Sequence, residues 1–432
     1  WLKSQNDEIK KWLDTVCFPA NPGEFCMVPN NRNELQMVVQ GIFDDQDILQ
    51  AGLLARGLPP GDYAFANLDD NSMTLAATAW GLGAYQFSKY KTMRNLRAKL
   101  CVDKCVDVKA LESVVCAIYL IRDMVNTGTQ DMNTHELADK VEEVAHAHGA
   151  TFSKIVGKDL LKANYPMIYA VGKGSVSEPQ LLELRWGDPE HPKVTLVGKG
   201  VCFDTGGLNL KFSDGMRYMK KDMAGAAHVL GLAQMIMQQG LPINLRVLIP
   251  AVENAISGNA YHPGDVLQSR KGLTVEVTNT DAEGRLVLGD ALTEAASESP
   301  ELIIDIATLT GAARAALGTE LSAMFTDDET LAMKILEHSF NVVDPIWRLP
   351  LYKPYRTLLQ SPVADLTNAV LIPNTGGAIT AALFLQEFVG SQTSWVHFDI
   401  MGWNLLARHV GIEGAEANVV RALFAYLKER FT

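Results

Sequence analysis

The stretch 279–285, Asn-Thr-Asp-Ala-Glu-Gly-Arg, places two carboxylates, Asp281 and Glu283, two residues apart and ahead of an apolar run. At the end of an extended strand, side chains two residues apart point the same way. Two carboxylates directed at one point repel each other unless a proton or a cation separates them. A divalent metal ion is the usual solution. The heptad therefore predicts a metal site whose other ligands come from elsewhere in the chain.

Two other segments carry charged residues at expected junctions between strands, loops and helices. Segment 197–211 contains Lys199, Asp204 and Lys211 among glycines, and segment 219–227 contains Asp222 at the start of an apolar helix. Glycines let the backbone approach a ligand closely, but the P-loop and Gly-x-Gly-x-x-Gly patterns are absent here. Taken alone, Asp222 is a helix N-cap and each lysine a solvated charge. If the three segments share one layer of loops, they indicate a site.

From about residue 165, strand patterns alternate with helix patterns, which predicts a largely parallel sheet covered on both faces. Binding sites in such sheets collect beyond the carboxyl ends of the strands. The expected strands are 194–197, 243–250, 274–277 and 302–306, and the expected helices are 222–239, 285–297, 377–388 and 416–428.

A chain of 432 residues is long enough for two or three domains. Residues 1–107 are expected to form a small α/β unit, with a strand at 35–39 and helices at 44–54 and 72–89 that begin at Asp44 and Ser72. This unit shows no constellation of acids, bases or ligands, so a packing or oligomerisation role is expected. An apolar helix at 108–126 would link it to a domain spanning 127–432, which opens with a helix at 134–148.

Composition limits the classes of partner. Lys and Arg number 38 against 50 Asp and Glu, which gives a formal net charge of −12. This charge disfavours nucleic acid and anionic membranes as main partners. No apolar run is long enough to span a bilayer, and the first residues lack a secretion signal. The six cysteines form no disulfide framework, so we expect a cytoplasmic protein with reduced thiols.

The order of these segments resembles the leucyl (cytosol) aminopeptidase family, the two-metal exopeptidases. The octet Asn-Thr-Asp-Ala-Glu-Gly-Arg-Leu that marks the family is intact at 279–286, and the intervals from Lys199 through Asp222 to Asp281 also match. The resemblance runs from about residue 110 to the C-terminus and is weak or absent before 107. It implies an α/β protein of two domains: a small variable N-terminal α/β domain and a larger catalytic domain with a central mixed, largely parallel sheet flanked by helices.

The resemblance also implies a ligand set. Asp204 and Glu283 would bridge two divalent ions, Asp281 would complete the first site, and Lys199 and Asp222 would complete the second. Lysine can bind a metal only as the neutral amine, a form that two nearby dications would favour. Zinc or manganese is expected, with magnesium and cobalt as alternatives, because the ligand types do not choose among them.

The implied reaction is the release of N-terminal amino acids from peptides by attack of a metal-bridging water or hydroxide on the first peptide bond. The Lys211 ammonium would stabilise the oxyanion. Arg285 would hold a bicarbonate ion as proton shuttle. Asp222 and the second metal would bind the free α-amino group of the substrate. Four histidines are expected to be structural: His146, His148, His228 and His397.

The substrate pocket of the family corresponds to seven positions here: Met219, Asn279, Thr308, Leu309, Gly311, Met401 and Asn404. Met401 is bulkier than the usual alanine and Asn404 is polar. We therefore expect a shallower or more polar pocket than a leucine-optimised enzyme has. Ala224 replaces a common glycine after Asp222 and Met223, a change expected to be tolerated.

Two other functional classes share parts of this pattern. A two-metal phosphoesterase would also use paired carboxylates, but the lysine ligand and the lack of a histidine-rich set disfavour it. A non-enzymatic protein that binds nucleic acid or serves a structural role is disfavoured by the net charge and by the intact set of site residues. The resemblance further implies a homohexamer acting on peptides with a free N-terminus, with no membrane association.

Overall fold

The computed structural model describes residues 1–43, 45–372, 375–390 and 393–432, and it divides into two compact units. The first unit comprises residues 1–115 and 406–413, and the second comprises residues 116–405 and 414–432. The division falls within α4 (Val108–Asn126), the helix that the sequence predicted as the link. Among the described residues, no helix combines the length and the apolar character needed to cross a membrane.

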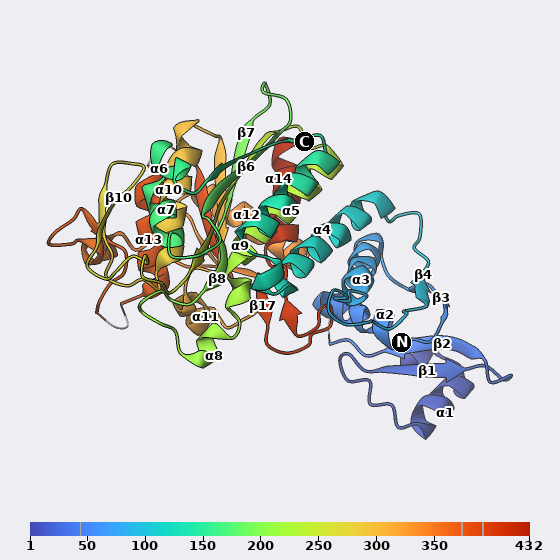
Figure 1. Cartoon of the computed structure of the whole chain (residues 1–432). Coiled ribbons are helices and arrows are strands. Elements are labelled where there is room, and N and C mark those ends of the chain that lie inside the picture. The colour runs from blue at the N-terminus through green and yellow to red at the C-terminus, as the bar shows by residue number, and fades with distance from the viewer. Residues whose placement is uncertain (44, 373–374, 391–392) are drawn as a thin grey trace. The chain divides into compact units, whose positions relative to one another are not determined.

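The second unit is built on one nine-stranded mixed sheet, in the order β14-β13-β16-β12-β7-β9-β6-β5, with β8 also paired to β9 (Figure 1). Its central strands β16, β12, β7 and β9 run parallel, and antiparallel pairs occur only toward the two edges. This confirms the expected mixed, largely parallel sheet. The strands are β5 (Thr151–Val156), β6 (Gln180–Trp186), β7 (Lys193–Gly198), β8 (Gly200–Asp204), β9 (Asn244–Asn254), β12 (Leu302–Ala307), β13 (Ser322–Phe325), β14 (Ile346–Arg348) and β16 (Trp395–Asp399).

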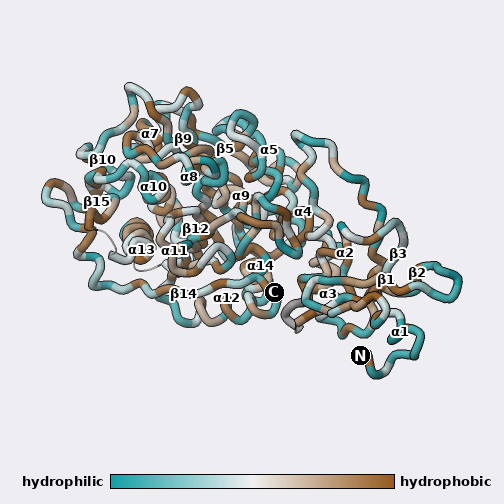
Figure 2. Tube along the Cα trace, turned by 90° about the horizontal axis from the view of Figure 1, so that it is seen from below, coloured by the Kyte–Doolittle hydropathy of each residue, from teal (hydrophilic) through white to brown (hydrophobic). Residues whose placement is uncertain are grey.

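Helices cover both faces of this sheet (Figure 1). One layer contains α7 (Pro166–Gly172), α10 (Glu283–Ser297) and α13 (Gly377–Val389), and the other contains α5 (Thr134–Ala147), α9 (Ala224–Gln239), α12 (Glu329–Asn341) and α14 (Val420–Phe431). Brown, apolar stretches of the trace run along β9, β12 and α9 in Figure 2. Burial of these apolar residues is the main driving force for the fold.

Shorter elements connect this framework. The helical ones are η3 (Thr129–Asp131), α6 (Asp159–Lys162), α8 (Ser213–Met216), η4 (Met219–Met223), α11 (Gly311–Leu317) and η5 (Lys353–Leu359). A separate three-stranded sheet contains β10 (Val266–Gln268), β11 (Thr274–Glu276) and β15 (Leu366–Thr367). The short strands β17 (Trp403–Asn404) and β18 (Gly414–Ala415) pair with each other. The strand expected at 274–277 therefore exists, but it lies outside the main sheet.

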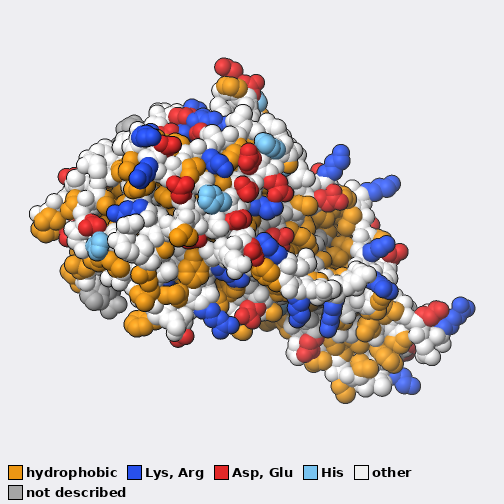
Figure 3. Space-filling view, in the orientation of Figure 1, with side chains coloured by type: hydrophobic (Ala, Val, Ile, Leu, Met, Phe, Trp, Pro, Cys, Tyr) orange, Lys and Arg blue, Asp and Glu red, His pale blue; other side chains and the backbone are white. Residues whose placement is uncertain are grey.

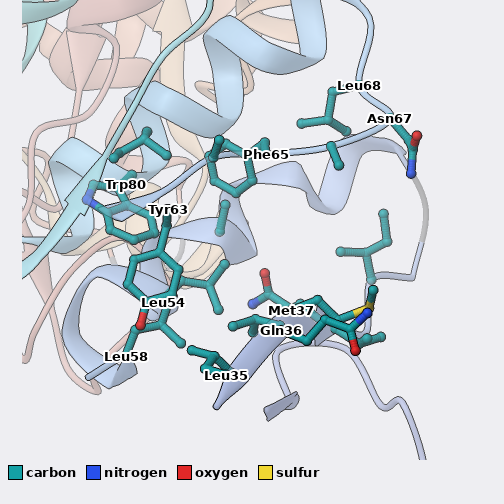
Figure 4. A pocket seen from close by; sticks show the side chains of 18 of the residues that line it. Leu35, Gln36, Met37, Leu54, Leu58, Tyr63, Phe65, Asn67, Leu68 and Trp80 are labelled. Carbon is teal, nitrogen blue, oxygen red and sulfur yellow. The ribbon is translucent and has the colours of Figure 1, made fainter. Parts of the chain in front are cut away.

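The first unit is a small α/β structure, as expected. Its elements are η1 (Leu2–Ser4), α1 (Asp7–Thr15), β1 (Phe25–Pro29), β2 (Leu35–Gln40), η2 (Asp45–Ala51), α2 (Gly52–Gly57), β3 (Gly61–Tyr63), α3 (Asp70–Gly83) and β4 (Ala98–Leu100). Figure 4 shows a cavity within it, between β2 and the segment 60–68, with Trp80 beside Tyr63. The volume of this cavity is about 1030 Å³. Asp62 is the one charged side chain among the described residues that line this cavity.

Several expected helix boundaries differ from the structure, and among them α9 begins at Ala224 instead of 222 and α10 at Glu283 instead of 285. The expected helix 72–89 is α3, which begins at Asp70 after the N-cap Asp69 and ends at Gly83. The expected helix 44–54 is a 3₁₀ turn followed by α2, and Asp44 lies outside the described residues. The expected helix 416–428 starts at Val420. Helix ends depend on capping groups that can come from distant parts of the chain.

Candidate active site

The residues singled out in the sequence converge at the carboxyl edge of the central parallel strands. Lys199 lies where β7 passes into β8, and Asp204 is the last residue of β8. Thr308 follows β12, and Met401 follows β16 by two residues. The carboxyl ends of parallel strands meet at one edge of a sheet. The candidate residues therefore lie at the edge of the sheet where the sequence analysis expected a site.

Three carboxylates gather at this edge. Asp204, Asp281 and Glu283 each offer an oxygen, and these three oxygens lie within 4.8 Å of one another. Glu283 opens α10, and Asp281 lies two residues before it in the preceding loop. Asp204 and Glu283 are buried, whereas Asp281 is half-buried. Such close carboxylates favour binding of a cation.

Two lysines lie between the carboxylates. Lys199 Nζ is 2.7 Å from Asp222 Oδ2 and 2.8 Å from Glu283 Oε1. Lys211 Nζ is 2.7 Å from Asp204 Oδ2 and also pairs with Asp281 Oδ1. Each of the six predicted charged residues therefore has an ion-pair partner within the cluster. Because two ammonium groups face four carboxylates, the cluster carries two excess negative charges when fully ionised.

The local field shifts the pKa values of these groups. Burial, reinforced by the charges of Glu283 and Asp222, raises the pKa of Asp204 well above its usual range. Burial also raises the pKa of Asp281 against the opposing effect of Lys211. For Asp222 burial acts upward, but the neighbouring Lys199 ammonium prevails and lowers the pKa. The crowding of negative charge is therefore only partly compensated by the lysines.

The donor set fits divalent metal ions. Glu283 Oε2 is buried and has no hydrogen-bond partner within the described part of the chain. An unsatisfied carboxylate oxygen at the centre of an acidic cluster is costly unless a cation binds there. Carboxylate oxygens with one amine suit zinc, manganese, magnesium or cobalt. The excess negative charge of the cluster also favours the binding of cations.

Small residues leave space for the Lys199 side chain beside the carboxylates. A Cβ placed on Gly284 would lie 2.6 Å from Lys199 Cε and 2.8 Å from Lys199 Nζ. Gly402, at φ +62°, would place a Cβ 2.7 Å from Cβ of Ala224. The methyl group of Ala224 is therefore accommodated because its neighbour is a glycine. This provides a physical reason why alanine fits at this position.

A second set of polar residues, which the sequence analysis did not single out, supports the ligands. Thr280 Oγ1 donates to the carbonyl of Gly206 (2.6 Å), and Asn209 exchanges hydrogen bonds with the backbone N–H and the hydroxyl of Thr280. Asn254 Nδ2 donates to Asp204 Oδ1 (2.8 Å), and Tyr261 Oη donates to the carbonyl of Thr280 (2.7 Å). Thr280 lies within the octet at 279–286, whereas the spacing of Asn209, Asn254 and Tyr261 matches no motif, so only the fold reveals these three.

The loop after β12 is tied both to the cluster and to β16. Thr308 Oγ1 donates to Asp222 Oδ1 (2.7 Å), and the Thr308 carbonyl accepts from Lys199 Nζ (3.1 Å). Asp399 accepts from the backbone N–H groups of Leu309 (2.9 Å) and Thr310 (3.2 Å). The loop that carries two of the predicted pocket residues is therefore held beside the ligands.

The other predicted pocket residues differ in their placement. Met219 and Met401 are half-buried, and Gly311 is exposed at the start of α11. Asn279 Oδ1 accepts from the backbone N–H of Asp281 (2.8 Å), so it shapes the metal-ligand loop. Asn404 is fully buried and donates to Glu416 Oε2 (2.5 Å). The amide of Asn404 is thus engaged by a buried carboxylate, and the expected polarity of the pocket stays a prediction.

Arg285 is buried in the first turn of α10. Its Nη1 donates to the carbonyl of Asn368 (2.7 Å), and Nε has no hydrogen-bond partner within the described ranges. Burial lowers the pKa of Arg285 to about 10, against the opposing charges of Glu283 and Asp399. The guanidinium therefore has unused donor capacity, which suits a small anion.

Two of the four histidines expected to be structural are buried in hydrogen-bonded positions. His228 Nδ1 lies 2.6 Å from the carbonyl of Ala224, and its Nε2 accepts from the backbone N–H of Asn418 (3.0 Å). His397 Nδ1 lies 2.6 Å from Asp305 Oδ1. These contacts join α9 to the segment before α14, and β12 to β16.

Comparison with known proteins identifies the family. The model of the cytosol aminopeptidase family, catalytic domain, matches residues 119–424, and the model of the M17 aminopeptidase, N-terminal domain, matches residues 1–103. The chain belongs to the cytosol aminopeptidase family. The second match corrects the expectation that family resemblance is weak or absent before residue 107. The cytosol aminopeptidase fold of two α/β domains is thereby confirmed.

Relatives and solved structures agree with this assignment. A probable cytosol aminopeptidase of Rickettsia felis is 35% identical over 374 residues, which cover 82% of this chain and 74% of the relative. Peptidase B of Pectobacterium atrosepticum is 38% identical over 339 residues, covering 76% and 78%. The crystal structure of the cytosol aminopeptidase from Coxiella burnetii has 48% identity and a TM-score of 0.96, over 100% of this chain and 94% of that one.

A second structural neighbour is a complex with manganese. The bottromycin maturation enzyme BotP in complex with Mn has 32% identity and a TM-score of 0.91, over 98% of this chain and 96% of that one. As a member of the cytosol aminopeptidase family, the chain is a hydrolase and an exopeptidase that acts on peptides. Its acidic cluster is compatible with a dinuclear metal site.

Proposed function

We propose that this aminopeptidase releases N-terminal residues through a dinuclear metal centre formed by Lys199, Asp204, Asp222, Asp281 and Glu283. The observation that carries the proposal is the convergence of these residues, from three separate segments, into one largely buried and negatively charged cluster. Asp204, Asp281 and Glu283 would hold the ions together with Lys199 and Asp222.

Divalent ions bound at this cluster would supply Lewis acidity, which activates water and polarises the scissile carbonyl. Without ions, the adjacent carboxylates raise the pKa of Lys199, although its burial opposes this effect. Two dications would reverse the sign of the local potential and favour the neutral amine. The change of Lys199 from an ion-pair partner to a ligand is therefore compatible with its position.

Lys211 would act as an electrostatic catalyst. Burial disfavours its ammonium form, but the surrounding carboxylates, Asp204 first, prevail and raise its pKa. In this structure the charges around Lys211 therefore favour the ammonium form. A fixed ammonium beside the reacting carbonyl stabilises the negative charge that develops on its oxygen.

Asp222 and Arg285 would recognise the substrate and a proton carrier, respectively. The Asp222 carboxylate would bind the free α-amino group of the peptide, so an acylated N-terminus would be excluded. The Arg285 guanidinium would hold bicarbonate, a group that would supply proton-transfer capacity when bound. Zinc or manganese is proposed as the resident metal, and the manganese complex of the structural neighbour BotP supports manganese.

The remaining proposals concern substrates and assembly. Met219, Asn279, Thr308, Leu309, Gly311, Met401 and Asn404 would line the pocket for the first residue. A cytoplasmic homohexamer that trims peptides with free N-termini is proposed from the family.

Acidic and basic side chains are interspersed over the face shown in Figure 3. Together with the net charge of −12, this argues against nucleic acid as a partner.

The proposed function is tested by removing one catalytic group. Lys211→Ala is expected to retain bound metal while kcat falls about 10²–10³-fold, because one oxyanion-stabilising group is lost. Turnover of aminoacyl p-nitroanilides (Leu, Ala, Met, Arg and Asp) would be measured with Mn²⁺ or Zn²⁺, with chelator, and alongside elemental analysis. Lys162→Ala is the matched control, because the Lys162 side chain is 79% exposed on α6.

Three outcomes decide between the proposals. Normal turnover by Lys211→Ala would remove its assigned role. A metal-loaded wild-type protein that cleaves none of the unblocked anilides, or cleaves N-acetyl-leucine p-nitroanilide equally well, contradicts the proposed function. A strong preference for the leucine anilide would contradict only the expectation of a shallower or more polar pocket, and the proposed function would stand.

A further inference from the structure

Asn254 joins two segments that carry proposed metal ligands. It is the last residue of β9 and is 1% exposed. Its Nδ2 donates to Asp204 Oδ1 (2.8 Å) and to the Thr280 carbonyl (3.0 Å). Asp204 ends β8, and Thr280 immediately precedes Asp281. One amide group therefore contacts both the β8 ligand and the loop that carries the next ligand.

The contacts of Asn254 fix which end of its amide faces the site. Both neighbours, a carboxylate oxygen and a carbonyl oxygen, can only accept hydrogen bonds, so the NH₂ end must point toward them. Asn254 Oδ1 has no hydrogen-bond partner within the described part of the chain. A buried amide oxygen without a partner is destabilising. The donor end is therefore what makes an asparagine favourable at this position.

The charge of the donor matters as well as its position. Asp204 Oδ1 accepts from Asn254 and from the Gly206 backbone N–H (2.8 Å), whereas Oδ2 faces the Lys211 ammonium. A cationic donor at position 254 would partly neutralise the carboxylate and weaken its attraction for a metal ion. A neutral amide orients the carboxylate and leaves its charge intact.

A second neutral donor supports the same carbonyl. Tyr261 Oη donates to the Thr280 carbonyl (2.7 Å), and the side chain is 1% exposed. The Thr280 carbonyl therefore accepts hydrogen bonds from Asn254, the last residue of β9, and from Tyr261, which follows β9 in the chain. Because Asp281 is the next residue, any shift of this carbonyl would move the ligand directly.

We infer that Asn254 is a positioning residue of the metal centre, acting through Asp204 and the Thr280 carbonyl, with Tyr261 assisting at the second contact. The inference rests on the proposed metal-dependent function and extends it to residues outside the ligand set. Loss of the Asn254 donor weakens metal binding and lowers kcat, while KM for the substrate changes little. Loss of the Tyr261 hydroxyl produces a smaller effect of the same kind.

The test compares metal affinity, stability and turnover in full-length variants. Mn²⁺ binding to metal-free wild type, Asn254→Ala and Tyr261→Phe would be measured by titration calorimetry. Melting temperatures would be measured in chelator, and kcat and KM at saturating Mn²⁺. Asn244→Ala is the matched control, because Asn244 begins the same strand, β9, and its amide donates only to the Pro189 carbonyl (3.4 Å).

The expected result for Asn254→Ala is a loss of about 10–100-fold in Mn²⁺ affinity, the range typical of groups that orient metal ligands. Its kcat falls, KM stays within about twofold, and Asn244→Ala behaves as wild type. Tyr261→Phe, which adds no atoms and removes one oxygen, shows a smaller loss and carries the test if Asn254→Ala does not fold. A folded variant with a lower melting temperature but wild-type affinity and kcat would overturn the inference.

The wild-type arm separates the two proposals. If wild type binds Mn²⁺ but cleaves no anilide, the proposed reaction fails, while the affinities of the variants still decide the role of Asn254. If wild type binds no divalent ion, the metal centre and the inference both fail. If wild type binds Mn²⁺ and is active, unchanged Mn²⁺ affinity in both variants contradicts the role of Asn254 and leaves the proposed function intact.

Discussion

Single residues decide how closely Lys199 approaches the carboxylates. Lys199 is 2% exposed and lies against Gly284, the second residue of α10. Glycine within a helix is destabilising relative to alanine by about 1 kcal/mol. Its presence here is explained by space, because any Cβ would overlap the lysine side chain. The octet at 279–286 thus contains a residue whose role is steric as well as residues whose role is chemical.

Gly284→Ala is expected to displace Lys199 from Asp222 and Glu283. Metal content and kcat should fall, whereas stability in chelator should change by no more than about 1–3 kcal/mol, because helix propensity offsets part of the overpacking. Elemental analysis and urea unfolding would measure the two effects. Gly215→Ala is the control, because a Cβ on Gly215 meets no atom within 4 Å. Wild-type metal content in Gly284→Ala would contradict this role.

The residues that sequence alone could predict are those with fixed spacing. Lys199, Asp204, Lys211, Asp222, Asp281 and Glu283 were expected together, and the structure brings them into contact. Asn254 and Tyr261 could not be found in this way. Their roles depend on where β9 ends relative to β8 and on the path of the chain after it. That information is contained in the sheet register, Asp204 opposite Asn254, rather than in a local pattern.

At the scale of elements, capping groups from distant segments set the helix boundaries. Glu416 was expected to begin the last helix, but it is a buried partner of Arg122 at 2.7 Å. The helix α14 begins at Val420, after Val419 at φ +61°. Asp344 accepts from the N–H groups of Val419 and Arg421, both at 3.0 Å, and so caps this helix. A cap from a segment that precedes β14 leaves no local sequence signal.

The contact between α9 and the segment before α14 depends on a neutral histidine. Burial lowers the pKa of His228 to about 4, with the Ala224 carbonyl opposing the shift. Between about pH 6.5 and pH 4 the unfolded chain binds a proton that the folded chain does not, so stability decreases as pH falls through this window. The full effect is about 3 kcal/mol, since one pKa unit corresponds to about 1.4 kcal/mol.

Urea unfolding in chelator at pH 7 and pH 5 would measure this dependence. His228→Gln is expected to be less stable than wild type at pH 7 but to lose less stability on acidification, because glutamine does not titrate. His191→Gln, at an exposed position, should keep the wild-type difference between the two pH values. An unchanged difference in His228→Gln would show that other groups cause the acid sensitivity.

At the scale of the whole molecule, the order of strands and helices predicted the class of the fold. It predicted the division of the chain into two units less completely. The alternation after residue 165 predicted β7, β9 and β12 at the centre of the sheet, whereas β5, β6, β8, β13, β14 and β16 were not predicted. Residues 406–413 belong to the first unit although they lie near the C-terminus. No compositional change marks this segment, so sequence reasoning assigned it to the catalytic domain.

Contacts within the first unit show how closely this segment is integrated. Arg56 Nη2 donates to the carbonyls of Arg408 (3.0 Å) and His409 (3.2 Å). A Cβ on Gly52 would lie 2.7 Å from the His409 carbonyl oxygen, and Val410 packs against the cluster around Ile48 and Ala76. The segment therefore fills part of the core of this unit.

A fragment comprising residues 1–115 is accordingly expected to be less ordered than the same fragment with residues 406–413 attached through a flexible linker. Circular dichroism melting and amide hydrogen exchange would compare the two fragments. A linked fragment carrying a scrambled 406–413 sequence is the control for length and composition. Equal cooperativity in all three fragments would contradict the structural role of this segment.

The placement of residues 406–413 has a consequence for biosynthesis. Domains at the start of a polypeptide ordinarily fold while the remainder is still being translated. Here residues 406–413, which complete the core of the first unit, leave the ribosome only after residues 116–405 have been translated. The nascent first unit must therefore wait, incomplete, until the catalytic portion has already emerged.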